Sequence, residues 1–244
     1  QGGKDIDIMA KIENRAGVKN LNEIMKVSDG IMVARGDLGV EIPYEELPDT
    51  QKSMISSCRV YGKRVITATE MLESMIHNPR PTRAEISDVA NAVYDGTSAV
   101  MLSGETAAGA FPVESVAAMA RIVERAENNV EYIQTIDSYA IKNSSEALSH
   151  SACTLAKDLN AKAIVVCTRT GGTARMVSRF RPLTPIIGLT TDERAYRKLA
   201  LSWGVIPAMA EEYTSVDILF YFAKIAALKS GLAKKGDTIV ITGG

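Results

Sequence analysis

Histidine, cysteine and aromatic residues are scarce in this sequence. Its 244 residues include two histidines and three cysteines, and aromatic residues make up 5%. The cysteines, Cys58, Cys153 and Cys167, are odd in number and show no C-x-x-C or Cys/His spacing, which argues against a disulfide framework and against a structural zinc site. We therefore expect a protein of the reducing cytoplasm.

Net charge and long apolar runs are also lacking. The 28 Lys and Arg residues nearly balance the 29 Asp and Glu residues, for a formal net charge of −1, so no sequence-wide basic field can attract nucleic acid or anionic lipid. No apolar stretch reaches the ~20 residues of a membrane span, because Lys224 interrupts the richest one, residues 218–228. The N-terminus has no signal-peptide pattern. We expect neither nucleic acid nor a membrane as a partner.

What the sequence does contain is enough apolar material for a sizeable core. Hydrophobic residues make up 46% and charged residues 23% of the chain, as is typical of globular proteins. The length admits two modest domains or one eight-stranded α/β barrel of roughly 250 residues. The chain starts at Gln1 without methionine and stops at Gly243 and Gly244, directly after an apolar run, so we expect both ends to be cut.

Short apolar runs alternate with longer helical patterns along the chain. Nearly continuous apolar runs are typical of buried parallel strands. Helix signals separate them: capping boxes at Thr82–Glu85 and Thr190–Glu193, a first-turn proline at Pro48, and stops at Gly62 and Gly231. The pattern predicts an α/β protein. The expected strands are residues 6–12, 30–34, 64–68, 99–102, 163–167, 185–189, 205–209 and 238–242.

The spacing of the strands changes in the middle of the chain. Between residues 114 and 159 there is no strand pattern, only two helical patterns and a polar stretch around Asp137 and Ser138. The eight strands could close one barrel or form two separate sheets, and this long interruption favours two sheets. We therefore predict two domains, residues 1–127 and residues 128–244.

Polar residues follow each of the first four predicted strands. The carboxyl ends of parallel strands are where α/β proteins gather functional groups. Alternation puts Lys11 and Glu13 on one face of their strand, and Thr67 and Thr69 on one face of theirs. Glu13 and Asp37 could together hold a magnesium ion, which prefers one or two carboxylates plus water and substrate oxygens. The polar segments are residues 11–13, 35–37, 67–70 and 103–105.

Other residues near these strand ends bear on the same site. Lys11 beside a metal would add positive charge suited to a phosphoryl group in transfer or to an enolate. The two histidines, His77 and His150, lie far from these strand ends in the sequence, which weakens a zinc or iron hypothesis. Gly36 allows close backbone approach to a ligand, although such a loop is more often an ordinary tight turn. One charged strand end is commonly just solvated, whereas four polar ends in succession favour a site.

A second candidate site follows the first strand of the second predicted domain. The segment combines threonine hydroxyls, two arginines and backbone N–H groups at the start of a predicted helix, which suits a phosphate. It is neither a Walker A loop nor a G-x-G-x-x-G fingerprint, and an ordinary glycine-rich turn with solvated arginines carries equal weight. Its residues are Thr168, Arg169, Thr170, Gly171, Gly172, Thr173, Ala174 and Arg175.

Taken together, several of these strings resemble the pyruvate kinase family, over essentially the whole chain. The resemblance implies strands five to eight of a (β/α)₈ TIM barrel, followed by most of a C-terminal α/β effector domain with three layers and a mostly parallel sheet. The strings are MAKIEN at residues 9–14, IMVARGDLG at 31–39, TATEML at 67–72, RPTRAE at 80–85, MLSGET at 101–106 and GDTIVITG at 236–243.

The resemblance implies transfer of a phosphoryl group from phosphoenolpyruvate to ADP, giving pyruvate and ATP in the last step of glycolysis, with Mg²⁺ or Mn²⁺ and usually K⁺. By position, Lys11 matches the lysine that stabilises the transferring phosphoryl group, and Glu13 and Asp37 match the metal ligands. Lys11, Gly36, Asp37 and Thr69 match substrate contacts, with Thr69 near the place where the enolate is protonated. The resemblance leaves undecided which group donates the proton to the enolate.

The resemblance also implies an allosteric homotetramer, with a sugar phosphate such as fructose 1,6-bisphosphate bound at the Thr168–Thr173 turn and Arg175. The apolar helix at residues 112–127 suits a subunit interface or burial within a domain. The family's first four barrel strands, which carry its K⁺ ligands, have no counterpart in the sequence, so we expect residues 1–244 alone to be inactive. Two alternatives stay open: a metal-dependent aldolase or lyase on a related pyruvate-binding barrel, and a non-catalytic fragment that binds a sugar phosphate.

Overall fold

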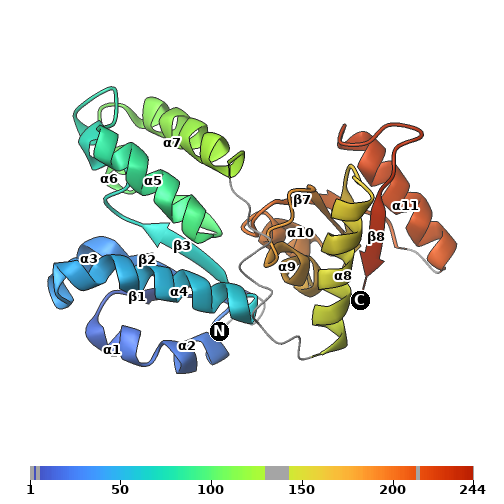
Figure 1. The fold of residues 1–244 in the computed structure, drawn as a ribbon, viewed down its shortest axis with the longest axis horizontal. Coiled ribbons are helices and arrows are strands. Elements are labelled where there is room, and N and C mark those ends of the chain that lie inside the picture. The colour runs from blue at the N-terminus through green and yellow to red at the C-terminus, as the bar shows by residue number, and fades with distance from the viewer. Residues whose placement is uncertain (1–2, 4–5, 130–142, 213–214, 244) are drawn as a thin grey trace. The chain divides into compact units, whose positions relative to one another are not determined.

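The computed structural model describes residue 3 and residues 6–129, 143–212 and 215–243. The chain divides into two compact units, residues 1–131 and 132–244, which are described separately below (Figure 1). Residues 137 and 138 of the expected polar stretch, and the chain ends at residues 1 and 244, lie outside the described residues. The domain boundary after residue 127 therefore stays a prediction.

The first unit is built on a four-stranded parallel sheet in the order β1-β2-β3-β4. Its strands are β1 (Met9–Ile12), β2 (Gly30–Ala34), β3 (Arg64–Ala68) and β4 (Ala99–Met101). Four strands are confirmed in this unit, but the first is shorter than the predicted residues 6–12 and the fourth ends one residue before the predicted 102. Because neighbours run parallel, all carboxyl ends lie at one edge of the sheet. Within the described residues, β1 and β4 each have one neighbour, so this sheet is open on both sides.

Local sequence signals explain where several helices of this unit begin and end. The predicted capping box forms at the start of α5, where Thr82 Oγ1 accepts the Glu85 N–H and the Glu85 carboxylate accepts the Thr82 N–H. Pro48 lies in the first turn of α4, and Gly62 ends that helix at a φ of +63°. The connecting elements are α1 (Arg15–Lys19), α2 (Leu21–Val27), α3 (Arg35–Glu41), η1 (Tyr44–Glu46), α4 (Leu47–Tyr61), η2 (Glu73–Ile76), α5 (Arg83–Asp95), α6 (Gly104–Ala107) and α7 (Pro112–Glu127).

Helices cover one face of this sheet and bury alternate strand residues. On the other face, Met32 and Ile66 pair in register and are only half-buried. Lys11 pairs in register with Met32, and in-register residues of parallel strands point to the same side, so Lys11 lies on this less covered face. The buried cluster under the helices comprises Ile12, Leu21, Met25, Ile31, Val33, Leu38, Ile42, Met54, Ile55, Cys58 and Val65.

The second unit is a three-layer α/β domain. Val165 and Val166 are consecutive residues of an inner strand, β5 (Ile164–Cys167). Val166 packs with residues of α8 and α9, whereas Val165 packs with residues of α11 on the opposite face of the sheet; Figure 1 shows these helices around the strands. The sheet is parallel in the order β7-β6-β5-β8. Its elements are α8 (Ser144–Asp158), β5 (Ile164–Cys167), α9 (Gly172–Ser178), β6 (Ile186–Thr190), α10 (Glu193–Leu199), β7 (Val205–Met209), α11 (Val216–Lys229) and β8 (Val240–Gly243).

One predicted helix start in this unit is wrong. Thr190 is the last residue of β6, and α10 begins after Asp192, whose side chain accepts the Ala195 N–H at 2.7 Å. An aspartate two residues beyond the threonine is at least as good an N-cap, and it sets the start of the helix. The predicted stop at Gly231 is confirmed, since Gly231 follows the end of α11 with a φ of +75°.

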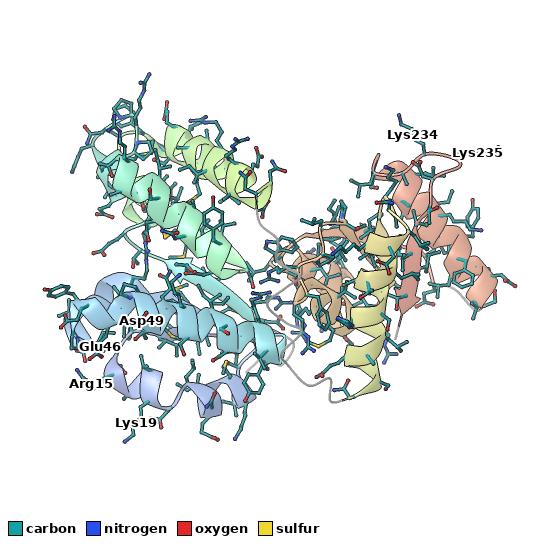
Figure 2. The ribbon with its side chains drawn as sticks, in the orientation of Figure 1. Arg15, Lys19, Glu46, Asp49, Lys234 and Lys235 are labelled. Carbon is teal, nitrogen blue, oxygen red and sulfur yellow. The ribbon has the colours of Figure 1, made fainter. Side chains whose placement is uncertain are left out.

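Charged side chains project outward from both units. Figure 2 labels Arg15 and Lys19 on α1 and Lys234 and Lys235 before β8, and all four are exposed. Both signs of charge occur on the surface, in line with the small net charge. Among the described residues, no helix combines the length and the apolar character needed to cross a bilayer.

Candidate active site

The carboxyl edge of the first sheet brings three charged side chains together. Lys11 is in β1, Glu13 directly follows that strand, and Asp37 is in the first turn of α3 after β2. The Lys11 Nζ donates to Asp37 Oδ2 at 2.6 Å and also contacts Glu13 Oε2. The side chains of Lys11, Glu13 and Asp37 are 48%, 43% and 55% exposed, so a ligand can reach all three.

The electrostatics of this cluster favour a bound cation. Hydrogen bonds to Asp37 and then to Glu13 raise the pKa of Lys11 above its ordinary 10.5, so Lys11 is charged at neutral pH. Two carboxylates thus converge on one positive atom and leave a formal excess of one negative charge. This donor set suits Mg²⁺ or Mn²⁺, which fills its remaining positions with water and substrate oxygens. Among the described residues, no group of three His, Cys, Asp or Glu side chains offers a larger metal cage.

The turn after β3 places Thr69 beside Gly36. The Gly36 N–H donates to Thr69 Oγ1 at 2.8 Å, and the Thr69 hydroxyl donates to the Ala68 carbonyl at 2.7 Å. The Gly36 N–H is thus hydrogen-bonded within the protein. Thr69 and Glu70 have φ of +67° and +53°, a region that residues other than glycine seldom occupy.

The prediction that Thr67 and Thr69 share a strand face does not hold. Alternation applies only within a strand, and β3 ends at Ala68. Thr67 is fully buried, in register with the buried Val33, and its hydroxyl bonds that of Thr97 at 3.0 Å. Of the two threonines, only Thr69 lies at the candidate site.

Sequence reasoning missed Arg35, which supports the Thr69 turn from within the protein. Arg35 is 6% exposed. Its Nε and Nη2 donate to the Thr69 carbonyl at 3.1 and 2.6 Å, and Nη2 also donates to the Glu70 carbonyl at 2.9 Å. Its Nη1 pairs with Asp88 of α5 at 2.6 Å. The sequence signal was a charged residue between a strand and Gly36, but polarity alone does not show that a side chain points inward.

The fourth polar strand end does not add a residue to the exposed cluster. Glu105 of α6 is fully buried, and its carboxylate accepts the N–H groups of Leu72 at 3.0 Å and Ser103 at 2.7 Å. It therefore joins the loop after β3 to the loop after β4. Of the four polar ends, the first three meet at the candidate site and the fourth stabilises the loops behind it.

The loop after β5 gives its residues different environments. Thr168 is buried, and its Oγ1 accepts the N–H of Gly171, whose φ is +83°. Arg169 and Thr170 are exposed, whereas Gly172, Thr173 and Arg175 are half-buried. Arg175 lies in the last turn of the seven-residue helix α9. The Thr168 hydroxyl therefore shapes the turn, and the exposed side chains of this loop are those of Arg169 and Thr170.

Fold and site define an α/β protein of the barrel-enzyme class, with a lysine and two carboxylates at the carboxyl edge of a parallel sheet. Family models described as "Pyruvate kinase, barrel domain" and "Pyruvate kinase, alpha/beta domain" match residues 1–116 and 146–244. The chain belongs to the pyruvate kinase family. Because the two matches cover both units, they favour this family over the aldolase or lyase alternative, which leaves the second unit unexplained.

Individual relatives agree with this assignment. A pyruvate kinase of Clostridium acetobutylicum is 50% identical over 246 residues, covering 100% of this chain and 52% of that protein. A pyruvate kinase of Geobacillus stearothermophilus is 52% identical, covering 98% and 41%. A crystal structure of a Cryptosporidium parvum pyruvate kinase superposes with a TM-score of 0.93 at 46% identity, covering 97% of this chain and 49% of that one. The chain thus spans about half the length of the curated relatives it matches.

Proposed function

We propose that this chain carries part of the catalytic machinery that transfers a phosphoryl group from phosphoenolpyruvate to ADP, giving pyruvate and ATP. The observation that carries the proposal is the position of the Lys11 Nζ between the carboxylates of Glu13 and Asp37, at the carboxyl edge of a parallel sheet. The match to pyruvate kinases across both units supports the same activity.

Each residue of the site has a chemical role in such a transfer. The Lys11 ammonium neutralises negative charge on the phosphoryl group as it moves. Glu13 and Asp37 would hold Mg²⁺ or Mn²⁺, which when bound supplies positive charge to phosphoryl and enolate oxygens. Gly36 and Thr69 line the adjacent turn, where they contact the substrate, and protonation of the enolate takes place near Thr69.

The complete enzyme needs groups that the described residues do not supply. The sheet of the first unit is open at β1 and β4, and exposed edges are avoided in closed barrels. We infer that further strands close the barrel and carry the K⁺ ligands. In this proposal the complete protein is a cytoplasmic homotetramer, and residues 1–244 alone give no turnover.

A chimera tests the proposal. Residues 1–244 replace the matching segment of the Clostridium acetobutylicum enzyme, and pyruvate formation is followed with lactate dehydrogenase in the presence of phosphoenolpyruvate, ADP and Mg²⁺. The chimera should turn over, and Lys11→Met should lower its kcat by about 10²-fold or more. Lys26→Met is the matched control, because Lys26 is an exposed lysine of α2 that pairs with Glu23.

Three outcomes would count against the proposal. A folded chimera without turnover would remove the assigned activity, and a Lys11→Met chimera with normal kcat would remove the role of Lys11. Substantial turnover by residues 1–244 alone would show that no further strands are needed.

We further propose that the loop after β5 binds the phosphate of a sugar-phosphate effector. Exposed Arg169 and Thr170 at the loop support this, since arginine is well suited to phosphate. In the chimera, Arg169→Glu should abolish activation by fructose 1,6-bisphosphate and leave basal kcat unchanged. An unaltered activation curve would contradict the assignment, and so would a chimera that is not activated at all.

A further inference from the structure

Arg35 occupies an unusual position for a charged residue at a strand end. It is the first residue of α3, directly after β2, in the same turn as Gly36 and Asp37. Its side chain does not reach the solvent at the carboxyl edge; it is 6% exposed and lies against the loop after β3. A buried guanidinium needs its donors satisfied, and this one finds carbonyl groups of the loop.

The loop that Arg35 contacts is the one with disfavoured backbone angles. Thr69 and Glu70, at φ of +67° and +53°, are consecutive residues without the freedom of glycine. Such conformations persist only where the surroundings hold them in place. The carbonyls of these same two residues accept hydrogen bonds from Arg35, at 2.6 Å for Thr69 and 2.9 Å for Glu70 from Nη2.

The shape of the guanidinium matters for this contact. Nε and Nη2 both reach the Thr69 carbonyl while Nη1 reaches Asp88 of α5 at 2.6 Å. A planar fork with five N–H donors can serve several acceptors at fixed angles, whereas a lysine ammonium is a single point of charge on a flexible stem. Asp88 anchors the far side of the fork and so sets its orientation.

The contact links two parts of the candidate site. Arg35 precedes Gly36, whose N–H donates to Thr69 Oγ1 at 2.8 Å, so side chain and backbone of consecutive residues hold opposite ends of Thr69. We propose that Arg35 is a positioning residue: through the carbonyls of Thr69 and Glu70 it fixes the turn that holds the Thr69 hydroxyl at the Gly36 N–H. Its effect on turnover rests on the function proposed above, whereas its effect on the turn does not.

The test compares Arg35→Lys with Arg64→Lys in the chimera. Arg64 is also a buried arginine with a carboxylate partner, Asp7, but it begins β3 at the opposite edge of the sheet. Arg35→Lys should lower kcat by about 10²-fold, the effect of a small misplacement, with the KM for phosphoenolpyruvate changed by less than about threefold. Arg64→Lys should lower the melting temperature similarly and leave kcat unchanged.

A second readout does not depend on activity. In residues 1–244, hydrogen exchange of the Gly36 amide should be faster by about tenfold or more in Arg35→Lys than in Arg64→Lys, because the turn loosens. Asp88→Asn keeps the carbonyl contacts of Arg35 but removes its ionic anchor, so it should raise the exchange rate of the Gly36 amide by a smaller factor. This variant replaces Arg35→Lys in the test if Arg35→Lys does not fold. Equal hydrogen exchange of the Gly36 amide in all variants would overturn the positioning role, and so would equal kcat values for the Arg35→Lys and Arg64→Lys chimeras. An inactive parent chimera would instead overturn the proposed function, with the Gly36 amide still deciding this inference.

Discussion

Lys11 and Asp37 stand 26 positions apart, yet the Nζ of one lies 2.6 Å from Oδ2 of the other. Parallel pairing of β1 with β2 puts Lys11 in register with Met32, and α3 begins immediately after β2, so Asp37 lies at the same edge. The cation of β1 and the anion of the helical turn that follows β2 therefore meet at the ends of two neighbouring strands. Substitution of Lys11 or Asp37 should therefore change the charge at the carboxyl edge and with it the binding of ions there.

Metal affinity should depend on both carboxylates of this edge. In residues 1–244, Glu13→Gln and Asp37→Asn should each weaken Mn²⁺ binding by about tenfold, because affinity at oxygen sites follows the number of charged ligands. Free Mn²⁺ measured by electron paramagnetic resonance gives the dissociation constants. Glu23→Gln, which alters an exposed glutamate of α2, should bind Mn²⁺ like the parent chain. Equal affinities in all three variants would rule out the ligand pair.

Acid stability should depend on Glu85. Burial by itself would raise the pKa of Glu85, but hydrogen bonds from Ser74 and Thr82 outweigh it and hold this pKa below the ordinary 4.5. A lowered pKa in the folded state stabilises the protein above the unfolded value. That contribution is present above pH 4.5 and is lost as the pH falls through the lower, folded pKa.

Glu85→Gln should therefore cost about 1 kcal/mol of unfolding free energy at pH 7, as for a lost helix cap, and should flatten the loss of stability below pH 4.5. Urea unfolding between pH 7 and pH 3 measures both effects. Glu114→Gln, in the exposed first turn of α7, is the control and should change little. If the unfolding free energy of Glu85→Gln and Glu114→Gln fell equally below pH 4.5, the role of Glu85 in acid stability would be contradicted.

The three cysteines should be unreactive in the folded protein. Burial raises the pKa of Cys58 and Cys153 to about 12 and that of Cys167 to about 11, so thiolate is scarce near neutral pH. Ellman's reagent at pH 8 should label none in the native chain and all three in guanidinium chloride. Since unfolded thiols ionise near 9.0, folding stability should fall as the pH rises from 9.0 towards 12. Rapid labelling of native protein would contradict this.

Loop packing behind the site should depend on Glu105. Its carboxylate accepts two N–H groups, from Leu72 and Ser103, whereas a glutamine offers one acceptor oxygen and one NH₂ donor. Glu105→Gln should therefore leave a buried N–H unpaired and cost about 1–3 kcal/mol. Denaturant unfolding measures the cost, and Glu124→Gln on the exposed side of α7 is the control. If Glu105→Gln lowered the unfolding free energy by no more than Glu124→Gln, the N–H groups of Leu72 and Ser103 would have found other partners.

Much of this protein follows from local sequence patterns. The apolar runs at residues 30–34 and 64–68 coincide with β2 and β3, because a buried parallel strand needs apolar side chains on both faces. The cluster of Lys11, Glu13 and Asp37 was predictable for a related reason: parallel strands end at one edge, so polar residues after adjacent strands must be near each other.

Two failures have a common physical origin. The capping box at Thr190 failed because Asp192 competes for the same helix start, and the shared face of Thr67 and Thr69 failed because β3 ends one residue too early. Both depend on where an element stops, and a difference of one or two residues decides which local rule applies.

The sequence by itself determined the α/β class, the strand order along the chain and the three charged residues at the carboxyl ends of the strands. Each of these depends on side-chain periodicity or on the residues next to a strand end. Only the tertiary structure decided that Arg35 and Glu105 turn inward and that Thr69 takes a left-handed conformation. Arg35 reaches Thr69 across 34 positions, and Glu105 reaches Leu72 across 33. Which buried acceptor or donor a charged side chain meets is set by packing between distant segments, and no local pattern contains that information.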